Sequence, residues 1–262
     1  MDNRCFGEIH IVIPRGDASI YTRSLYGCKA SEVSDIVILT PIDDIIQGLR
    51  ERGEKIIELK GFFKGFHAHI GSRRFTLFKS LIGSPGAGDC LYYLRFTPCR
   101  YVIYTGLIGA LQDWIEVGDL IAPTSAYRGE GASKYFVDEA YPAAADFQLL
   151  RRFSDILDEL LKGEEIKIHY GAIYTTDSFA SETDEFLERW RRRRLIGIEM
   201  ETSAIYTIAR LIGIKAAAIH LVSDNPITGK TLFHELPEED RRRMERGRGL
   251  LIEALARLIE SL

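Results

Sequence analysis

The sequence lacks any apolar run that approaches the ~20 residues of a membrane span, and its opening stretch, MDNRCFGEIH, lacks the apolar segment of a signal peptide. Its four cysteines include no Cys-x-x-Cys pair, which argues against a disulfide framework and against a zinc site. A net charge of -4, from 34 Lys and Arg against 38 Asp and Glu, argues against a nucleic-acid or membrane partner. We therefore expect a soluble, cytoplasmic protein.

Strand and helix patterns alternate along the chain. β-branched or aromatic stretches bounded by turn residues predict strands over 9–13, 34–40, 73–81, 100–106, 119–123, 167–176 and 215–224. Helical patterns cover 43–53, 86–96, 143–163, 184–194, 202–213 and 237–262. This alternation predicts an α/β fold with a largely parallel or mixed central sheet. No repeat or linker divides the chain, so we expect a single domain over residues 1–262.

Motifs that suggest a cofactor or a metal are weak in this sequence. The glycines of GSPGAG, at residues 83–88, do not follow the order of a GxGxxG dinucleotide loop. His67 and His69 alternate on one extended stretch, but no carboxylate or cysteine stands near them at ligand spacing. We therefore expect neither a cofactor nor a metal ion.

The stretch GIEMETSAIY, at residues 197–206, places two glutamates between an apolar segment and a predicted helix. In an extended segment Glu199 and Glu201 point to the same side, at the strand end where α/β proteins bind ligands. A buried carboxylate without a partner is costly, whereas the vicinal diol of a ribose offers two hydroxyl donors at matching spacing. The alternative, that the glutamates cap the following helix, explains only one of them. The pair therefore favours a ribose site.

The stretch LVSDNP, at residues 221–226, ends another apolar strand with Ser223 and Asp224. This adds a third carboxylate at the same end of the predicted sheet. Burial and neighbouring acids raise the pKa of a carboxyl group. Asp224 is therefore a candidate general acid.

Taken together, these segments resemble the purine nucleoside and uridine phosphorylase family, which includes nucleosidases. Residues 80–94 resemble the family's glycine turn and helix, residues 126–150 its central loop and long helix, and residues 174–179 its base-binding strand. The resemblance spans nearly the whole chain. It implies a mixed sheet that curls toward a barrel and is flanked by helices, in a homo-oligomer that is a trimer of dimers or a dimer.

The resemblance also implies roles for single residues. Glu201 would hold the ribose hydroxyls with help from Glu199, while Met200 would lie against the sugar. Phe179 would stack on the base, and Asp224 would give a proton or a hydrogen bond to the leaving purine. His10 would reach the 5′ end of a ligand in a neighbouring subunit. The implied substrate-binding set is Glu199, Met200, Glu201, Phe179, His10, Gly109 and Ser223, with Asp224 as the catalytic residue.

The positions that hold phosphate in the family's phosphorylases differ here. The stretch TPIDDIIQ replaces a Pro-Gly-Asp-Pro-x-Arg loop, and Tyr104 and Leu107 replace an arginine and a serine. Asp43 and Asp44 would repel an anion at this place. YTGLIGAL resembles a segment of the family's nucleosidases, and RGEGAS and SDNP resemble the short AMP nucleosidases. We therefore expect hydrolysis, with Asp43 or Asp44 positioning the water.

The first interpretation is thus hydrolytic cleavage of the N-glycosidic bond of a purine ribonucleoside or nucleotide. Thr183 and Glu185 stand where uridine phosphorylases carry a uracil-reading glutamine and arginine, which favours a purine. Two alternatives stay open: a phosphate-dependent phosphorylase of purine or uridine type, and a non-catalytic nucleoside-binding relative. The partner in each case is a small-molecule nucleoside or nucleotide. Neither the preferred base nor a need for a 5′-phosphate follows from the sequence.

Overall fold

The structure, a computed structural model, describes residues 18–231 and 235–262. The predicted strand over residues 9–13 and the predicted binding residue His10 therefore lie outside the described residues. Within those ranges, no helix is long and apolar enough to cross a membrane.

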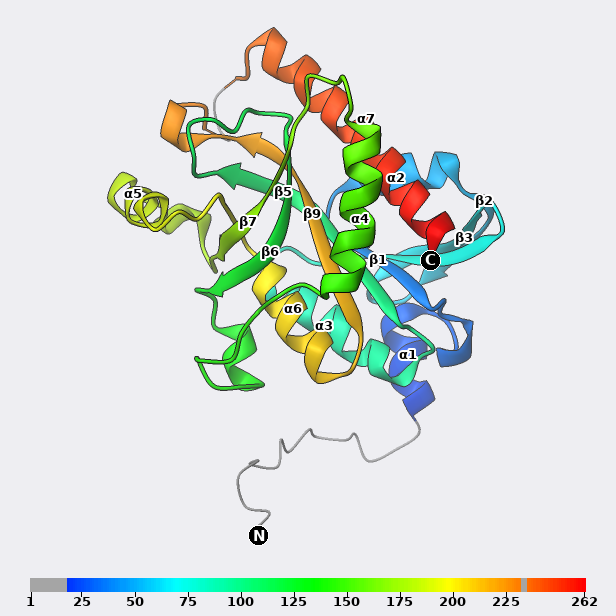
Figure 1. The fold of residues 1–262 in the computed structure, drawn as a ribbon. Helices are drawn as coiled ribbons and strands as arrows, with labels where there is room; N and C mark the ends of the chain where they lie inside the picture. The colour runs from blue at the N-terminus through cyan, green and yellow to red at the C-terminus, as the bar shows by residue number, and fades with distance from the viewer. Residues whose placement is uncertain (1–17, 232–234) are drawn as a thin grey trace.

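Six of the predicted strands form, and three further strands join them (Figure 1). The six are β1 (Ile36–Thr40), β4 (Arg73–Lys79), β5 (Tyr101–Ala110), β6 (Leu120–Arg128), β7 (Ile168–Thr175) and β9 (Lys215–Asp224). The additional strands are β2 (Glu54–Lys60), β3 (Lys64–Ile70) and β8 (Gly197–Glu199). Nearly every residue of β2 is exposed, Ile56 and Ile57 included. β8 is too short to produce a pattern.

The six predicted helices form, and α1 (Ala18–Tyr26) precedes them. The six are α2 (Asp43–Arg52), α3 (Ser84–Tyr92), α4 (Phe147–Leu160), α5 (Asp184–Arg192), α6 (Thr202–Leu211) and α7 (Glu238–Ser261). α4 begins later than predicted because the Asp146 side chain caps it, accepting a hydrogen bond from Leu149 N at 2.9 Å.

The nine strands form one mixed sheet in the order β2-β3-β4-β1-β5-β8-β7-β6-β9. β1 is parallel to β4 and β5, whereas β5 is antiparallel to β8. A further pairing between β5 and β9 closes β5, β8, β7, β6 and β9 into a five-stranded barrel. The predicted α/β fold, with a mixed sheet that curls toward a barrel, is confirmed.

Helices cover both faces of the sheet around β1, whose five residues are all buried. Ile36 and Ile38 belong to a core cluster that includes residues of α2, α4 and α7. Val37 and Leu39 point the other way, into a cluster with residues of α3 and α6. Figure 1 shows these two groups of helices on opposite sides of the strands. The continuous apolar run of β1 is therefore that of a strand buried on both faces.

Candidate active site

A cavity of about 450 Å³ lies beside the last residues of β5, β8 and β9. Segments that are far apart in the sequence form its wall, including the loops that follow β1 and β4. It brings together seven of the predicted site residues, namely Gly109, Phe179, Glu199, Met200, Glu201, Ser223 and Asp224.

The barrel closure brings Asp224 to this cavity. The register between β5 and β9 shifts after Ile108, and this shift pairs Gly109 with Asp224. A Cβ atom added at Gly109 would lie 3.4 Å from Asp224 Oδ2. A larger side chain at Gly109 would therefore cover the carboxylate, and glycine keeps it open to the cavity.

Glu199 is buried, and both of its carboxylate oxygens accept hydrogen bonds. Oε1 accepts from the Thr175 hydroxyl at 2.6 Å. Oε2 accepts from the backbone N–H groups of Glu201 and Thr202 and from the Thr202 hydroxyl, each at 2.8 Å. Burial and the charge of Glu201 raise the pKa of Glu199 to about 7, while these donors act in the opposite direction. The Glu199 side chain thus accepts from the N–H groups at the start of α6, whose N-cap residue is Glu201.

Glu201 is also buried, but it has fewer protein partners. Its Oε1 accepts from the backbone N–H of Gly83 at 2.5 Å. Burial raises the pKa of Glu201, and the Gly83 N–H and the Tyr104 hydroxyl lower it. A carboxylate offers about four acceptor positions, so Glu201 keeps capacity for donors from a ligand.

Asp224 lies at the end of β9 and is hydrogen-bonded by its neighbour. The Ser223 hydroxyl donates to Asp224 Oδ1 at 2.6 Å. Burial raises the pKa of Asp224, and the Ser223 hydrogen bond opposes this shift. The raised pKa moves Asp224 toward the range in which a carboxyl group serves as a general acid near neutral pH.

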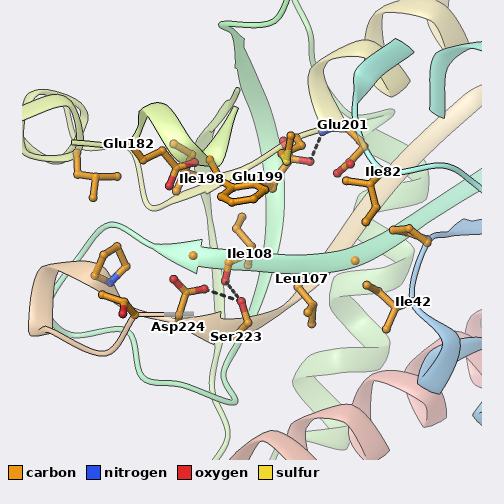
Figure 2. A pocket seen from close by; sticks show the side chains of 18 residues that line it. Ile42, Ile82, Leu107, Ile108, Glu182, Ile198, Glu199, Glu201, Ser223 and Asp224 are labelled. Atoms are coloured by element: carbon orange, nitrogen blue, oxygen red, sulfur yellow. Dashed lines mark hydrogen bonds between the residues drawn. The ribbon is translucent and has the colours of Figure 1, made fainter. Parts of the chain in front are cut away.

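The cavity has two chemically different ends (Figure 2). Asp224 lies at one end, and a carboxylate that was not among the predicted site residues, Glu182, lies at the same end. Glu201 lies at the other end, together with Ile42 and Ile82. A ligand that fills this cavity therefore meets carboxylates at both of its ends.

Asp43 and Asp44 lie elsewhere. Both are exposed residues in the first turn of α2, and neither lines the cavity. Lys79 binds Asp43, with 2.6 Å between Nζ and Oδ1, and Arg248 forms an ion pair with Asp44. The hypothesis that one of them positions a water molecule has no support in this geometry.

Apolar side chains form much of the wall near Glu201. Ile42, Ile82 and Leu107 line this part of the cavity, and no lysine or arginine of the described residues lines any part of it. Tyr104, at the position of a family arginine, is fully buried, and this burial raises its pKa well above the usual value. In the described part of one chain, the cavity therefore contains no cation for an anionic ligand.

A family model described as the phosphorylase superfamily matches residues 35–260. This chain belongs to the phosphorylase superfamily. The resemblance to this superfamily is thereby confirmed, whereas a closer likeness to its nucleosidases stays a prediction.

Individual members of the superfamily are similar over most of this chain. A guanosine phosphorylase of Halorubrum lacusprofundi is 32% identical over 203 residues, which are 75% of this chain and 81% of that protein. A uridine phosphorylase of Thermococcus kodakarensis is 26% identical over 219 residues, 78% of this chain and 77% of that protein. The crystal structure of a uridine phosphorylase from Vibrio fischeri has a TM-score of 0.75 at 27% identity, covering 88% of this chain and 93% of that one.

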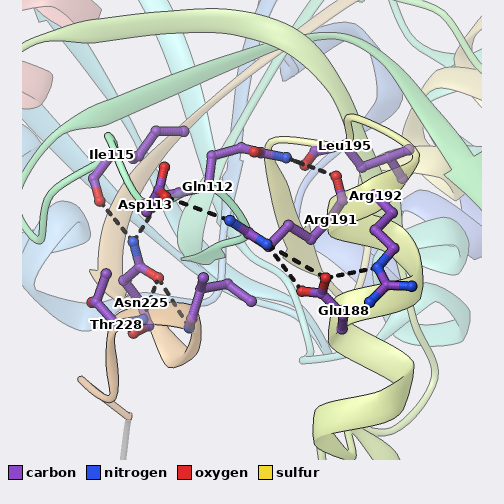
Figure 3. A network of polar contacts seen from close by, with 10 residues as sticks. Gln112, Asp113, Ile115, Glu188, Arg191, Arg192, Leu195, Asn225 and Thr228 are labelled. Atoms are coloured by element: carbon purple, nitrogen blue, oxygen red, sulfur yellow. Dashed lines mark hydrogen bonds and ion pairs between the residues drawn. The ribbon is translucent and has the colours of Figure 1, made fainter.

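In this phosphorylase superfamily member, a polar network fixes the segment that follows Asp224 (Figure 3). The Asn225 side chain donates to the carbonyl oxygens of Gln112 and Ile115 at 2.9 and 2.8 Å. The Gln112 side chain donates to the Leu195 carbonyl at 2.7 Å. This network ties the end of β9 to the loop after β5 and to the segment after α5. It therefore restrains the backbone on which Asp224 stands.

Proposed function

We propose that the protein cleaves the N-glycosidic bond of a purine ribonucleoside and transfers the ribosyl group to phosphate. The observation that carries this proposal is that Asp224 and Glu201 lie at opposite ends of one cavity. Cleavage of this bond develops positive charge on the sugar and negative charge on the base. A protonated Asp224 at the base and an ionised Glu201 at the sugar would stabilise both charges.

The residues at the uracil-reading positions of uridine phosphorylases, Thr183 and Glu185, lie outside the cavity. The Thr183 hydroxyl caps α5 by accepting a hydrogen bond from Phe186 N at 3.2 Å. Glu185 is exposed, and neither it nor Thr183 lines the cavity. This supports a purine as the base, in agreement with the name of the guanosine phosphorylase relative.

The names of the relatives support phosphate as the acceptor, rather than the water expected from the sequence. Hydrolysis is the second candidate, and one observation favours it: no lysine or arginine of the described residues lines the cavity. Phosphorolysis requires a site for a dianion, which arginine and lysine side chains provide best. If phosphate is the acceptor, the cationic side chains that bind it come from outside the described part of a single chain.

Product identity decides between these functions. Purified protein is incubated with guanosine or inosine in phosphate buffer and in a phosphate-free buffer, and the released base and sugar are quantified. We expect cleavage to require phosphate and to yield ribose 1-phosphate. Equal rates in both buffers, with free ribose as the product, would establish hydrolysis. Tight nucleoside binding without cleavage in either buffer would show that the protein is a non-catalytic nucleoside-binding relative.

Glu201→Gln tests the ribose end of the cavity. We expect kcat/KM for a ribonucleoside to fall about 10–100-fold, because a hydrogen bond to a charged group contributes about 1.5–3 kcal/mol. The matching 2′-deoxyribonucleoside never supplied the 2′-hydroxyl, so its kcat/KM should fall much less. The measurement is the ratio of kcat/KM for the two sugars in both proteins. Equal losses on both sugars would contradict the role of Glu201.

We also propose that the chain works as a homo-oligomer in the cytoplasm, as the family resemblance implies. The role of His10 at the 5′ end of a neighbouring subunit's ligand stays a prediction, because His10 lies outside the described residues. Comparing the cleavage of guanosine with that of GMP tests whether a 5′-phosphate is needed.

A further inference from the structure

We propose that the Glu182 carboxylate reads the base and selects 6-oxopurines, such as guanine and hypoxanthine, over adenine. This inference rests on the proposed function, because it specifies which base the same cavity accepts. The proposed function assigns direct roles to Asp224 and Glu201 and none to Glu182.

Glu182 lies between two helical elements that hold its backbone in place. It directly follows η4 (Phe179–Ser181), the short helical turn that carries the predicted stacking residue, and it precedes α5. Its backbone N–H donates to the Phe179 carbonyl at 3.1 Å. Figure 2 shows its side chain at the same end of the cavity as Asp224. A base that stacks on Phe179 therefore lies within the region that Glu182 faces.

Glu182 lacks protein partners for its charge. Within the described residues, its carboxylate forms no hydrogen bond or ion pair, and the charged group that acts on it is Asp224. Burial and the charge of Asp224 raise the pKa of Glu182 to about 7. A partly buried carboxylate without donors is unfavourable in the empty cavity. A ligand that brings N–H donors to this place removes that penalty.

The chemistry of the purine edge determines which ligand does so. An ionised carboxylate only accepts hydrogen bonds. Guanine presents two adjacent donors, N1–H and the 2-amino group, which match the two oxygens of one carboxylate. Hypoxanthine presents N1–H alone. Adenine presents an unprotonated N1, whose lone pair would face a carboxylate oxygen. The expected order of preference is therefore guanine, then hypoxanthine, then adenine.

With such a base bound, Glu182 would be ionised and Asp224 would be protonated. Donors from the base favour the ionised form of Glu182, because hydrogen bonds to a charged form stabilise it. The charge of Asp224 raises the pKa of Glu182. Because repulsion between like charges is mutual, an ionised Glu182 would in turn disfavour a second charge on Asp224. A 6-oxopurine thus promotes the protonated Asp224 that departure of the base requires.

Glu182→Gln tests the inference, because the amide offers one donor and one acceptor and no longer rejects adenine. We would measure kcat/KM for guanosine, inosine and adenosine at pH 7.5, above the Glu182 pKa of about 7. Hypoxanthine and adenine binding would be measured alongside by equilibrium dialysis. We expect kcat/KM for guanosine to fall about 10–100-fold and that for adenosine to stay within a few-fold of wild type. The preference of the wild-type protein for hypoxanthine over adenine should disappear in the variant.

Glu185→Gln is the matched control, because it makes the same change three residues away, outside the cavity. It should leave all the ratios unchanged. Retained selectivity in Glu182→Gln, equal losses on all three nucleosides, or a wild-type protein that shows no preference between the bases would each overturn the inference. If the bases bind with a preference that depends on Glu182, but no nucleoside is cleaved, the proposed function fails and this inference stands.

Discussion

Asp224→Asn is expected to lower turnover by about 10²–10⁴-fold while leaving the fold unchanged, because general acid catalysis typically contributes that much. An amide of the same shape can donate a hydrogen bond to the base, but it cannot deliver a proton. The Asn225 network holds the backbone next to this position, so the substitution should not displace the end of β9.

The measurement is kcat on a purine nucleoside, together with its pH profile and a thermal unfolding curve. Burial raises the pKa of Asp224, so activity that needs its proton should fall as the pH rises through that pKa. The Asn variant should lose this fall along with most of its activity. Asp184→Asn, at an exposed position in the first turn of α5, is the control for charge removal. Near-normal activity in a folded Asp224→Asn protein would remove Asp224 from the mechanism.

A continuous apolar run predicts a strand that is buried on both faces. β1 reads as a continuous apolar run because both of its faces are covered. The predicted strand over residues 119–123 ends at Pro123, and proline is normally excluded from a central strand. The strand continues to Arg128 because the register shifts between Pro123 and Ser125, and this bulge accommodates the proline. The pairing of β5 with β9 that closes the barrel joins distant segments, and local patterns do not contain such information.

Some residues of the candidate site are predictable from the sequence, and others are not. Glu199, Glu201 and Asp224 follow apolar segments, so their positions at strand ends were predictable, and the structure places all three at one cavity. Glu182 follows no strand and carries no motif. Only the three-dimensional arrangement shows that it faces Asp224. Position along the chain predicts a site role for Asp43 and Asp44, whereas their side chains are bound by basic residues outside the cavity.

Glu199 and Glu201 differ in their hydrogen-bond partners and therefore in their roles. The Glu199 oxygens are occupied by donors from Thr175, Glu201 and Thr202 at the start of α6. Glu201 accepts a backbone hydrogen bond from Gly83, and it faces the end of the cavity assigned to ribose. We infer that Glu199 holds α6 and the Glu201 backbone in place, and that Glu201 contacts the sugar.

Glu199→Leu is accordingly expected to destabilise the protein by about 2–5 kcal/mol, because it leaves the buried N–H groups of Glu201 and Thr202 without an acceptor. Thermal unfolding measures this loss, at about 2–4 °C for each kcal/mol in a chain of this size. Glu199→Gln is the matched variant, since its amide oxygen still accepts from both N–H groups while its amide nitrogen donates to the Thr175 hydroxyl. It should retain most of the stability and the ratio of ribonucleoside to 2′-deoxyribonucleoside activity. A collapse of that ratio in a stable Glu199→Gln protein would show that Glu199 contacts the sugar directly.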